Sequence, residues 1–311
     1  MIDEGLYVEL DAYRCHVFLD FREIRVDDEG LLRRLEEELG GRGVDSVDLS
    51  LTELAHRDVL TPFAELVSAE NLEALSELSS LDSAAGGESD TIGELLPFFE
   101  EMLAAVVLRE GDGRDPDQVV RALRRDLERV ALLGEDIESE GGVAHGRGWW
   151  ATLLSWILTR HLGEIVDRKD PHGRVIGWFD EWLLGRVIER TIAELGPVEA
   201  RRVVDTVRLL LVVEGLWATD GGAVDMASVL STLTARDPGR AFLGINRWDE
   251  VLWYRAEAMS ELAGWLRVVA NLKTWDDPET VVTVEGALAR MENAIVESRF
   301  RVIDLLELLA R

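Results

Sequence analysis

The chain has 311 residues, with 61 Asp and Glu against 33 Lys and Arg, which gives a formal net charge of -28 at pH 7. This excess of carboxylates, without a basic patch, argues against nucleic acid and anionic membranes as partners. A hydrophobic fraction of 47% excludes an intrinsically disordered chain and indicates a globular protein with a sizeable core.

A single cysteine, Cys15, leaves no partner for an intramolecular disulfide, which is typical of a reducing compartment. The first nine residues are acidic and lack the positive charge of a secretory signal peptide. The longest apolar runs, Trp149–Leu158 and Leu209–Val213, are too short to span a bilayer. We therefore expect a soluble cytoplasmic protein. Abundant carboxylates with only two lysines, Lys169 and Lys273, are typical of a high-salt cytoplasm, or of a GC-rich genome that favours arginine.

Two strands are predicted near the N-terminus. The strands are Leu6–Leu10 and His16–Val26, in which large apolar residues alternate at Leu6, Val8 and Leu10 and at Val17, Leu19 and Phe21, the pattern of half-buried strands. The link Asp11–Cys15 is short enough to join them as a hairpin. Because a two-stranded hairpin is only marginally stable, we expect it to pack on the helices or to extend a larger sheet.

From Asp27 onwards the chain has the spacing of amphipathic and buried helices. Strands and helices do not alternate, which excludes a parallel sheet. The fold class that we predict is mainly α, a multi-helix bundle-like array with a short N-terminal β-hairpin. Pro62 is expected to separate two helices, and Pro97 to start or kink another. The helices predicted before the final pair are 31–39, 49–60, 69–78, 92–108, 119–133, 149–166, 175–195, 198–217 and 223–235.

The last stretch, Asp277–Arg311, organises the predicted fold. Apolar residues fall at alternating three- and four-residue steps, with only Ser298 out of place, so one apolar stripe follows a single long helix over Glu279–Leu309. Pro278 suits the first helical position because its missing N–H needs no partner there. We expect this helix to pack in an antiparallel pair with a helix over Trp248–Leu272.

Composition divides the chain into four parts. The hairpin takes residues 1–26, and an N-terminal helical part takes residues 27–133. Residues 134–148 are acidic and then glycine-rich, so they are predicted to form a linker or an exposed loop. A C-terminal helical part, 149–311, contains the long final helix.

Metal ligands are one kind of site that the sequence suggests. Glu53 and His56 form a Glu-x-x-His element, which di-iron bundles use twice, and His161 and Glu164 show the reverse order. Such residues on one helix face also bind zinc. A histidine with protein or solvent partners is far more common, however, so a metal site is the weakest of our hypotheses.

The ten tryptophans are the most unusual feature, and all of them follow residue 148. Tryptophan rings stack on sugars, and the indole N–H adds a polar contact, so tryptophans near loops are candidates for glucan binding. Most of the others are expected in the core, since Trp178 and Trp182 stand one helical turn apart, the spacing of a packed face. The candidate ligand-binding residues are Asn246, Arg247, Trp248, Trp149 and Trp150.

No catalytic signature stands out, and no cofactor is expected. With 61 acidic residues, any spacing rule for a pair of glycosidase carboxylates is satisfied by chance. The chain has no Gly-x-Ser-x-Gly motif, and Cys15 lacks a helix N-terminus that would activate its thiol. The glycines of Gly141–Gly148 lack the preceding strand and the Gly-Lys-Ser/Thr of a phosphate-binding loop.

Two segments resemble a known family. Tyr13–Glu23, YRCHVFLDFRE, is similar to the strand that closes the C-terminal β-domain in large bacterial proteins of the α-amylase superfamily. Phe242–Trp248, FLGINRW, with Val251–Tyr254, VLWY, resembles a segment in the helical tail of the same proteins. There, a leucine-glycine-valine-asparagine stretch leads to a tryptophan-phenylalanine-asparagine-lysine run. Tyr254-Arg255-Ala256 replaces the end of that run here.

The resemblance implies that this chain corresponds to a non-catalytic C-terminal region of such a glycosidase. Enzymes of the family carry their catalytic Asp and Glu on a (β/α)8 barrel, and this sequence shows neither the Gly-x-Arg-x-Asp motif nor barrel strands, so no catalytic residue is carried over. We expect docking, stability or oligomerisation as its role, either on an α-amylase-type catalytic domain or by self-association. The alternatives are a module that binds α-glucan through surface tryptophans and an independent enzyme with a helical-bundle metal site.

Overall fold

The computed structural model describes residues 30–78, 91–110, 115–141, 146–166, 171–217, 225–275 and 278–311. The chain splits into two compact units, the first ending at Ala55 and the second beginning at His56. Helices dominate the described residues, which confirms the mainly α fold class. The N-terminal hairpin predicted over Leu6–Leu10 and His16–Val26 lies outside these residues.

The first unit contains helices α1 (Leu31–Leu39) and α2 (Val47–Ala55), which pack against each other. Helix α1 has the predicted bounds. It ends because Gly40 takes a left-handed conformation, with φ at 53°, and donates its N–H to the carbonyl of Glu36. Glycine is the residue that adopts this conformation without a steric penalty.

The second unit opens with four helices, of which α3 and α5 pack most extensively. They are α3 (Arg57–Leu66), α4 (Ala69–Glu77), α5 (Thr91–Glu110) and α6 (Pro116–Gly141). The prediction of one helix over 49–60 ended by Pro62 is wrong. The helix is interrupted at His56, between α2 and α3, and Pro62 lies inside α3. Proline deprives the carbonyl of Asp58 of its helical donor, and Asp58 is exposed, so water can take the donor's place.

Helix α6 continues through Gly141, so residues 134–141 are helical, where a linker or loop was predicted. The acidic composition of this stretch suits a solvated helix as well as a loop. Residues 142–145 of the predicted linker lie outside the described residues.

The middle of the second unit is built around a helix buried on all sides. Its elements are α7 (Arg147–Arg160), the 3-10 turn η2 (His161–Ile165), α8 (Pro171–Glu181), α9 (Leu184–Thr191), the 3-10 turn η3 (Ala193–Leu195) and α10 (Pro197–Trp217). Every residue of α7 from Ala151 to Thr159 is buried. Its two buried threonines bond within the helix, since Thr152 Oγ1 donates to the Gly148 carbonyl at 2.8 Å and Thr159 Oγ1 to the Ser155 carbonyl at 2.7 Å. Helix α7 can therefore contact neighbours around its whole circumference.

The helix predicted over Val175–Leu195 is split into α8 and α9. The break falls at Trp182 and Leu183, where Leu183 takes a left-handed conformation with φ at 61°. Trp182 is buried there and stacks on Trp178, with ring centroids 4.7 Å apart. The predicted packed face is therefore present, although the helix is not continuous.

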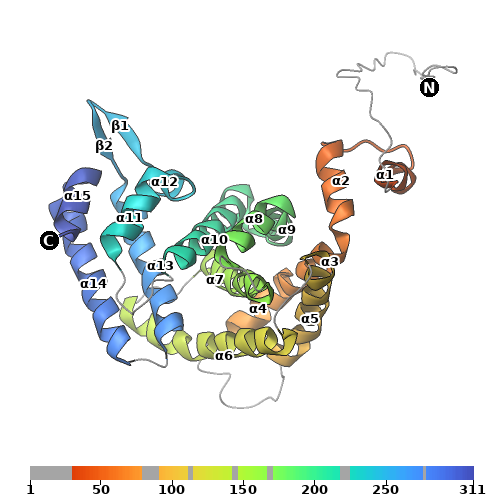
Figure 1. Ribbon diagram of the computed structural model, residues 1–311, viewed down its shortest axis with the longest axis horizontal. Coiled ribbons are helices and arrows are strands. Elements are labelled where there is room, and N and C mark those ends of the chain that lie inside the picture. Colours follow the sequence, from red (N-terminus) through yellow and green to blue (C-terminus); the bar gives the residue numbers. More distant parts are fainter. Residues whose placement is uncertain are drawn as a thin grey trace. The chain divides into compact units, whose positions relative to one another are not determined.

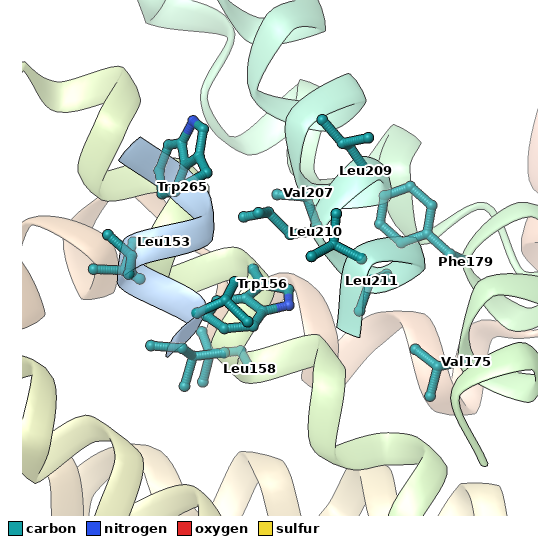
Figure 2. Packing of buried hydrophobic residues seen from close by; sticks show 14 of the residues in the cluster. Leu153, Trp156, Leu158, Val175, Phe179, Val207, Leu209, Leu210, Leu211 and Trp265 are labelled. Carbon is teal, nitrogen blue, oxygen red and sulfur yellow. The ribbon is translucent and has the colours of Figure 1, made fainter. Parts of the chain in front are cut away.

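The core of the second unit joins α7, α8, α10 and α13 (Ala256–Thr274), as Figure 2 shows. Helix α10 packs against α7, α8 and α9. Trp156 and Trp178 are fully buried, and Trp182 and Trp265 nearly so. The expectation that tryptophans contribute to the core is therefore confirmed for these four.

The C-terminal third of the second unit combines helices with a small antiparallel sheet (Figure 1). Its elements are α11 (Met226–Ala235), α12 (Gly239–Phe242), β1 (Asn246–Trp248), β2 (Val251–Trp253), α13 (Ala256–Thr274), α14 (Pro278–Glu297) and α15 (Val302–Leu309). Helices α13 and α14 pack side by side, so the predicted final pair exists. The predicted start of its first helix at Trp248 is wrong, since residues 246–253 form the hairpin.

The predicted single long final helix is also wrong, and the out-of-place Ser298 marks the break. Arg299 and Phe300 take left-handed conformations with φ at 50° and 69°. Ser298 is buried, and its Oγ lies 2.5 Å from the hydroxyl of Tyr254, which also donates to the Ile295 carbonyl. The Tyr254 N–H in turn donates to the Phe300 carbonyl at 3.0 Å. The segment after β2 thus supplies the hydrogen bonds that stabilise the interruption.

Among the described residues, no helix combines the length and apolar composition needed to cross a membrane.

Candidate functional site

The four predicted metal ligands lie in two places. Glu53 is on α2 of the first unit, and His56 precedes α3 in the second, where its ring lies 5.9 Å from that of Trp182. His161 and Glu164 both lie on η2 and contact each other. Within the described residues, no group of three or more His, Cys, Asp or Glu side chains is arranged to hold a metal ion.

The imidazole of His161 lies between two carboxylates. Nε2 is 2.9 Å from Asp126 Oδ2, and Nδ1 is 2.9 Å from Glu164 Oε1. Burial by itself lowers the pKa of His161, but the hydrogen bonds with Asp126 and Glu164 outweigh it and raise the pKa above the ordinary 6.5. A ring protonated on both nitrogens has no lone pair for a metal ion. The geometry therefore favours an ion-pair role for His161 and Glu164.

Arg160 extends this arrangement into the core. Its Nη1 donates to Asp126 Oδ2 at 2.7 Å, and its Nε donates to Glu214 Oε1 at 2.8 Å. Lys273 Nζ lies 3.6 Å from the same Glu214 oxygen. The Arg160 guanidinium also lies 4.9 Å from the ring centroid of the buried Trp156, a cation–π geometry.

These groups form a set that we call the buried ionic cluster. Its members are Asp126, Arg160, His161, Glu164, Glu214 and Lys273. With His161 protonated, the six groups carry three negative and three positive charges, and Arg129 adds a further positive charge 3.7 Å from Asp126. The side chain of Glu214 is only 3% exposed, and that of Arg160 9%. Burial raises the pKa of Glu214, but the charges of Arg160 and Lys273 outweigh it, and the net shift is downward.

The buried ionic cluster connects α6, α7, η2, α10 and α13, so it links helices that are far apart in the sequence. Each of its charged groups has a protein partner, and ion pairs of this kind fix which helix faces meet. We therefore assign it a structural role. Sequence reasoning missed it, although one signal was present: Glu214 directly follows the apolar run Leu209–Val213, and Arg160 follows Trp149–Leu158.

The raised pKa of His161 predicts that stability falls with rising pH. Protonated His161 contributes its full stabilisation below the unfolded-state pKa of about 6.5 and loses it as pH rises through the higher folded-state pKa. In that window the free energy of unfolding is expected to fall by up to about 1.4 kcal/mol per pH unit. Urea denaturation across this range should show the slope in the wild type and a clearly smaller one in His161→Gln. Equal slopes would contradict protonation of this ring.

The predicted ligand-binding residues Trp149 and Trp150 take different roles at the start of α7. Trp149 stacks on Trp265, with ring centroids 5.4 Å apart and an angle of 13° between the planes. Trp150 lines a cavity of about 250 Å³ together with Arg147 and Glu194, whose side chains pair at 2.7 Å. Trp149 is thus largely a packing residue, whereas Trp150 reaches a small cavity lined by both polar and apolar side chains.

The other three predicted ligand-binding residues lie on strand β1. In the register of the hairpin Asn246 pairs with Trp253 and Trp248 with Val251, so these four share one face, which we call the hairpin outer face. Arg247 lies on the opposite face and pairs with Glu250 in the turn at 3.6 Å. No described contact joins the hairpin to Trp149 or Trp150, so the predicted residues do not form one site.

Trp248 is the most exposed aromatic residue in the described chain, at 70%. Its ring lies 6.5 Å from that of Trp253, whose Nε1 donates to the Trp248 carbonyl. The turn residues Asp249 and Glu250 both have positive φ, 48° and 61°, as two-residue hairpin turns require. The tight turn therefore holds the exposed Trp248 near the tip of the hairpin, with the half-buried Trp253 behind it on the same face.

A cleft of about 680 Å³ lies between α10 and the segments around α12 and α13. Four arginines and four acidic residues line it, so it has no net charge. Arg202 pairs there with Glu261, and Arg208 with Asp180 outside the cleft. With its charges balanced in this way, the cleft does not select one class of ligand.

The chain matches no protein-family model, no curated protein and no solved structure. The resemblance to the α-amylase superfamily therefore rests on the two quoted segments alone.

Proposed function

We propose that this protein is a docking protein, whose helical body presents the hairpin outer face to another protein. The observation that carries the proposal is the exposure of Trp248 on a strand held in a fixed position. Exposed tryptophans with a rigid backbone are frequent energetic centres of protein interfaces, since little entropy is lost when they bind. Because the chain is strongly acidic, an exposed face without charged residues differs from its general composition, and exposed apolar patches of this kind mark interaction sites.

The base of the hairpin supports this role because it is anchored on both sides. Leu252, on the inner face, packs against the hydrophobic core. Trp253 forms an antiparallel bridge with Arg301, and Tyr254 is buried against Ser298. The tip therefore projects from a base that several hydrogen bonds and core contacts hold in place.

The partner that we propose is the catalytic domain of an α-amylase-type glycosidase. Support for this choice comes from the sequence resemblance, since Phe242–Trp248 and Val251–Tyr254 include both strands of the hairpin. The segment that carries the resemblance is thus the segment that presents Trp248.

Binding of the purified chain to the α-amylase-type catalytic domain of its source organism tests the proposal. Replacing Trp248 with alanine is expected to weaken binding about thirtyfold, the effect of losing a hot-spot tryptophan. Leu108, 86% exposed on α5, provides the control, and Leu108→Ala should bind like the wild type. Biolayer interferometry measures both. Equal affinities for wild type and Trp248→Ala would exclude the hairpin as the docking site.

Glucan binding is a second candidate function, favoured by the paired rings of Trp248 and Trp253 beside the amide of Asn246. Two indole rings and one amide on one strand face can stack on a sugar and bond its hydroxyls. Titration with maltoheptaose at low and at multimolar salt should then give a saturable change in tryptophan fluorescence that Trp248→Ala abolishes. A flat titration in both salts would reject this candidate and leave the protein-docking proposal untouched.

A further inference from the structure

Helix α14 carries two lines of uncharged residues, and only one of them is covered by the part of the chain that the structure describes. The inner line, Val284, Leu288, Met291 and Ile295, is buried. The outer line is exposed at every position and consists of Val282, Gly286, Ala289, Asn293 and Val296. Val282 is 74% exposed and Val296 76%. In a chain with 30% charged residues, five uncharged residues in a row on an exposed ridge are unexpected.

The outer line has the spacing of a helix–helix contact. Its steps of four, three, four and three residues repeat as in the seam of a coiled coil. At its centre, Gly286 weakens the isolated helix, and a Cβ built there would meet no atom within 4 Å. Packing among the described residues therefore does not require this glycine, whereas close approach of another helix would benefit from it.

The charges beside the outer line indicate what covers it. On one flank, Glu285 and Glu292 are already paired with Arg267 of α13. On the other flank stand Arg290 and Glu297, both exposed and without an ion pair in the described part of the chain. They are two helical turns, roughly 10 Å, apart, which is too far for them to pair with each other.

We infer that the outer line of α14 binds the same line of a second copy of this chain, with the two helices antiparallel. Such a contact has twofold symmetry, so each surface must complement itself. With Asn293 near the axis, Arg290 of each copy faces Glu297 of the other, and Ala289 faces Val296. Small residues thus oppose larger ones, and two ion pairs form at once. This surface lies on α14 and not on the hairpin outer face, so the inference is independent of the proposed function.

Sedimentation equilibrium of the full chain tests the inference. At about 0.5 M NaCl the Debye length is roughly 4 Å, which screens the long-range repulsion between two acidic chains. The mass is expected to rise with concentration from the 34.8 kDa of one chain towards twice that value. Ala289→Glu places two like charges at the contact and should abolish the rise. Ala104→Glu, at an exposed position of α5, is the matched control and should dimerise like the wild type.

Charge reversal distinguishes the antiparallel contact from any other self-association. Arg290→Glu and Glu297→Arg each create like-charged pairs across the axis and should weaken dimerisation by roughly tenfold or more. The double variant exchanges the two charges and should recover most of the wild-type affinity. Circular dichroism of each variant confirms that these exposed substitutions leave the fold intact.

Two results would overturn the inference. A chain that remains monomeric up to about 200 µM has no useful affinity for itself on the scale of protein association, and the outer line would then belong to a different protein. A dimer that survives Ala289→Glu uses another surface. In both cases binding through Trp248 remains a separate question, since that residue is unchanged in all five variants.

Discussion

Replacing Glu214 with leucine is expected to lower the free energy of unfolding by about 3–5 kcal/mol, the cost of removing one partner from a buried ion pair. Leucine is similar in size and favours helices, so the substitution changes charge more than packing. It leaves Lys273 without its carboxylate and Arg160 with Asp126 as its hydrogen-bonded carboxylate, and the side chain of Arg160 is only 9% exposed. Urea denaturation followed by far-UV circular dichroism measures the difference.

An exposed ion pair provides the matched control for this prediction. Asp180 pairs with Arg208 at 2.6 Å, but both side chains are well exposed, at 50% and 38%. Because exposed pairs contribute little, Asp180→Leu should change stability by less than about 1 kcal/mol. If Glu214→Leu were as mild as this control, the buried ionic cluster would not be a structural element of the core.

Replacing Trp156 with alanine is expected to cost about 3–5 kcal/mol, because the cavity left by a fully buried indole is large. The substitution also removes the ring beneath the Arg160 guanidinium, so it disturbs the buried ionic cluster as well. Trp156→Phe keeps an aromatic ring and should lose about 1–2 kcal/mol. Thermal and urea denaturation of both variants should show that Trp156→Ala loses more stability than Trp156→Phe.

Replacing an exposed tryptophan with alanine shows how much of the stability lost at Trp156 is due to its burial and how much to the type of residue. Trp248 is 70% exposed, so Trp248→Ala should cost less than about 1 kcal/mol. A loss at Trp156 no greater than that at Trp248 would contradict the central position of α7.

Helical periodicity predicted most of the fold correctly, because buried helix faces repeat at a spacing that a single sequence displays. It failed where a short local feature interrupts a longer pattern. The stripe from α14 to α15 continues past Ser298, but at the break the Ser298 hydroxyl is hydrogen-bonded to that of Tyr254, forty-four positions earlier in the chain. Such a partner cannot be read from the local pattern.

The hairpin β1–β2 was missed for a related reason. Strands of three residues are too short to show an alternating pattern, and their apolar residues fitted a helix equally well. A turn of Asp249 and Glu250 also lacks the glycine that usually identifies a two-residue hairpin turn.

The candidate sites were predicted only in part. Trp248 was identified because it stands near a loop, and its exposure agrees with that reasoning. Trp149 satisfied the same criterion, yet it packs on Trp265, which is far away in the sequence. Of the buried ionic cluster only His161 and Glu164 were singled out, and as metal ligands; the cluster itself was missed because its six members come from five elements, and in so acidic a chain no carboxylate stands out by composition.

Site-specific photo-crosslinking from position 248 in living cells tests the central claim most directly, since it needs no prior choice of partner. A photoreactive phenylalanine replaces Trp248 in one variant and Leu108, an even more exposed apolar residue of α5, in the control. We predict that position 248 forms a crosslinked product with one protein, identified by mass spectrometry as an α-amylase-type enzyme, and that position 108 does not. If position 248 yields no product beyond that of position 108, the hairpin outer face is not a docking surface.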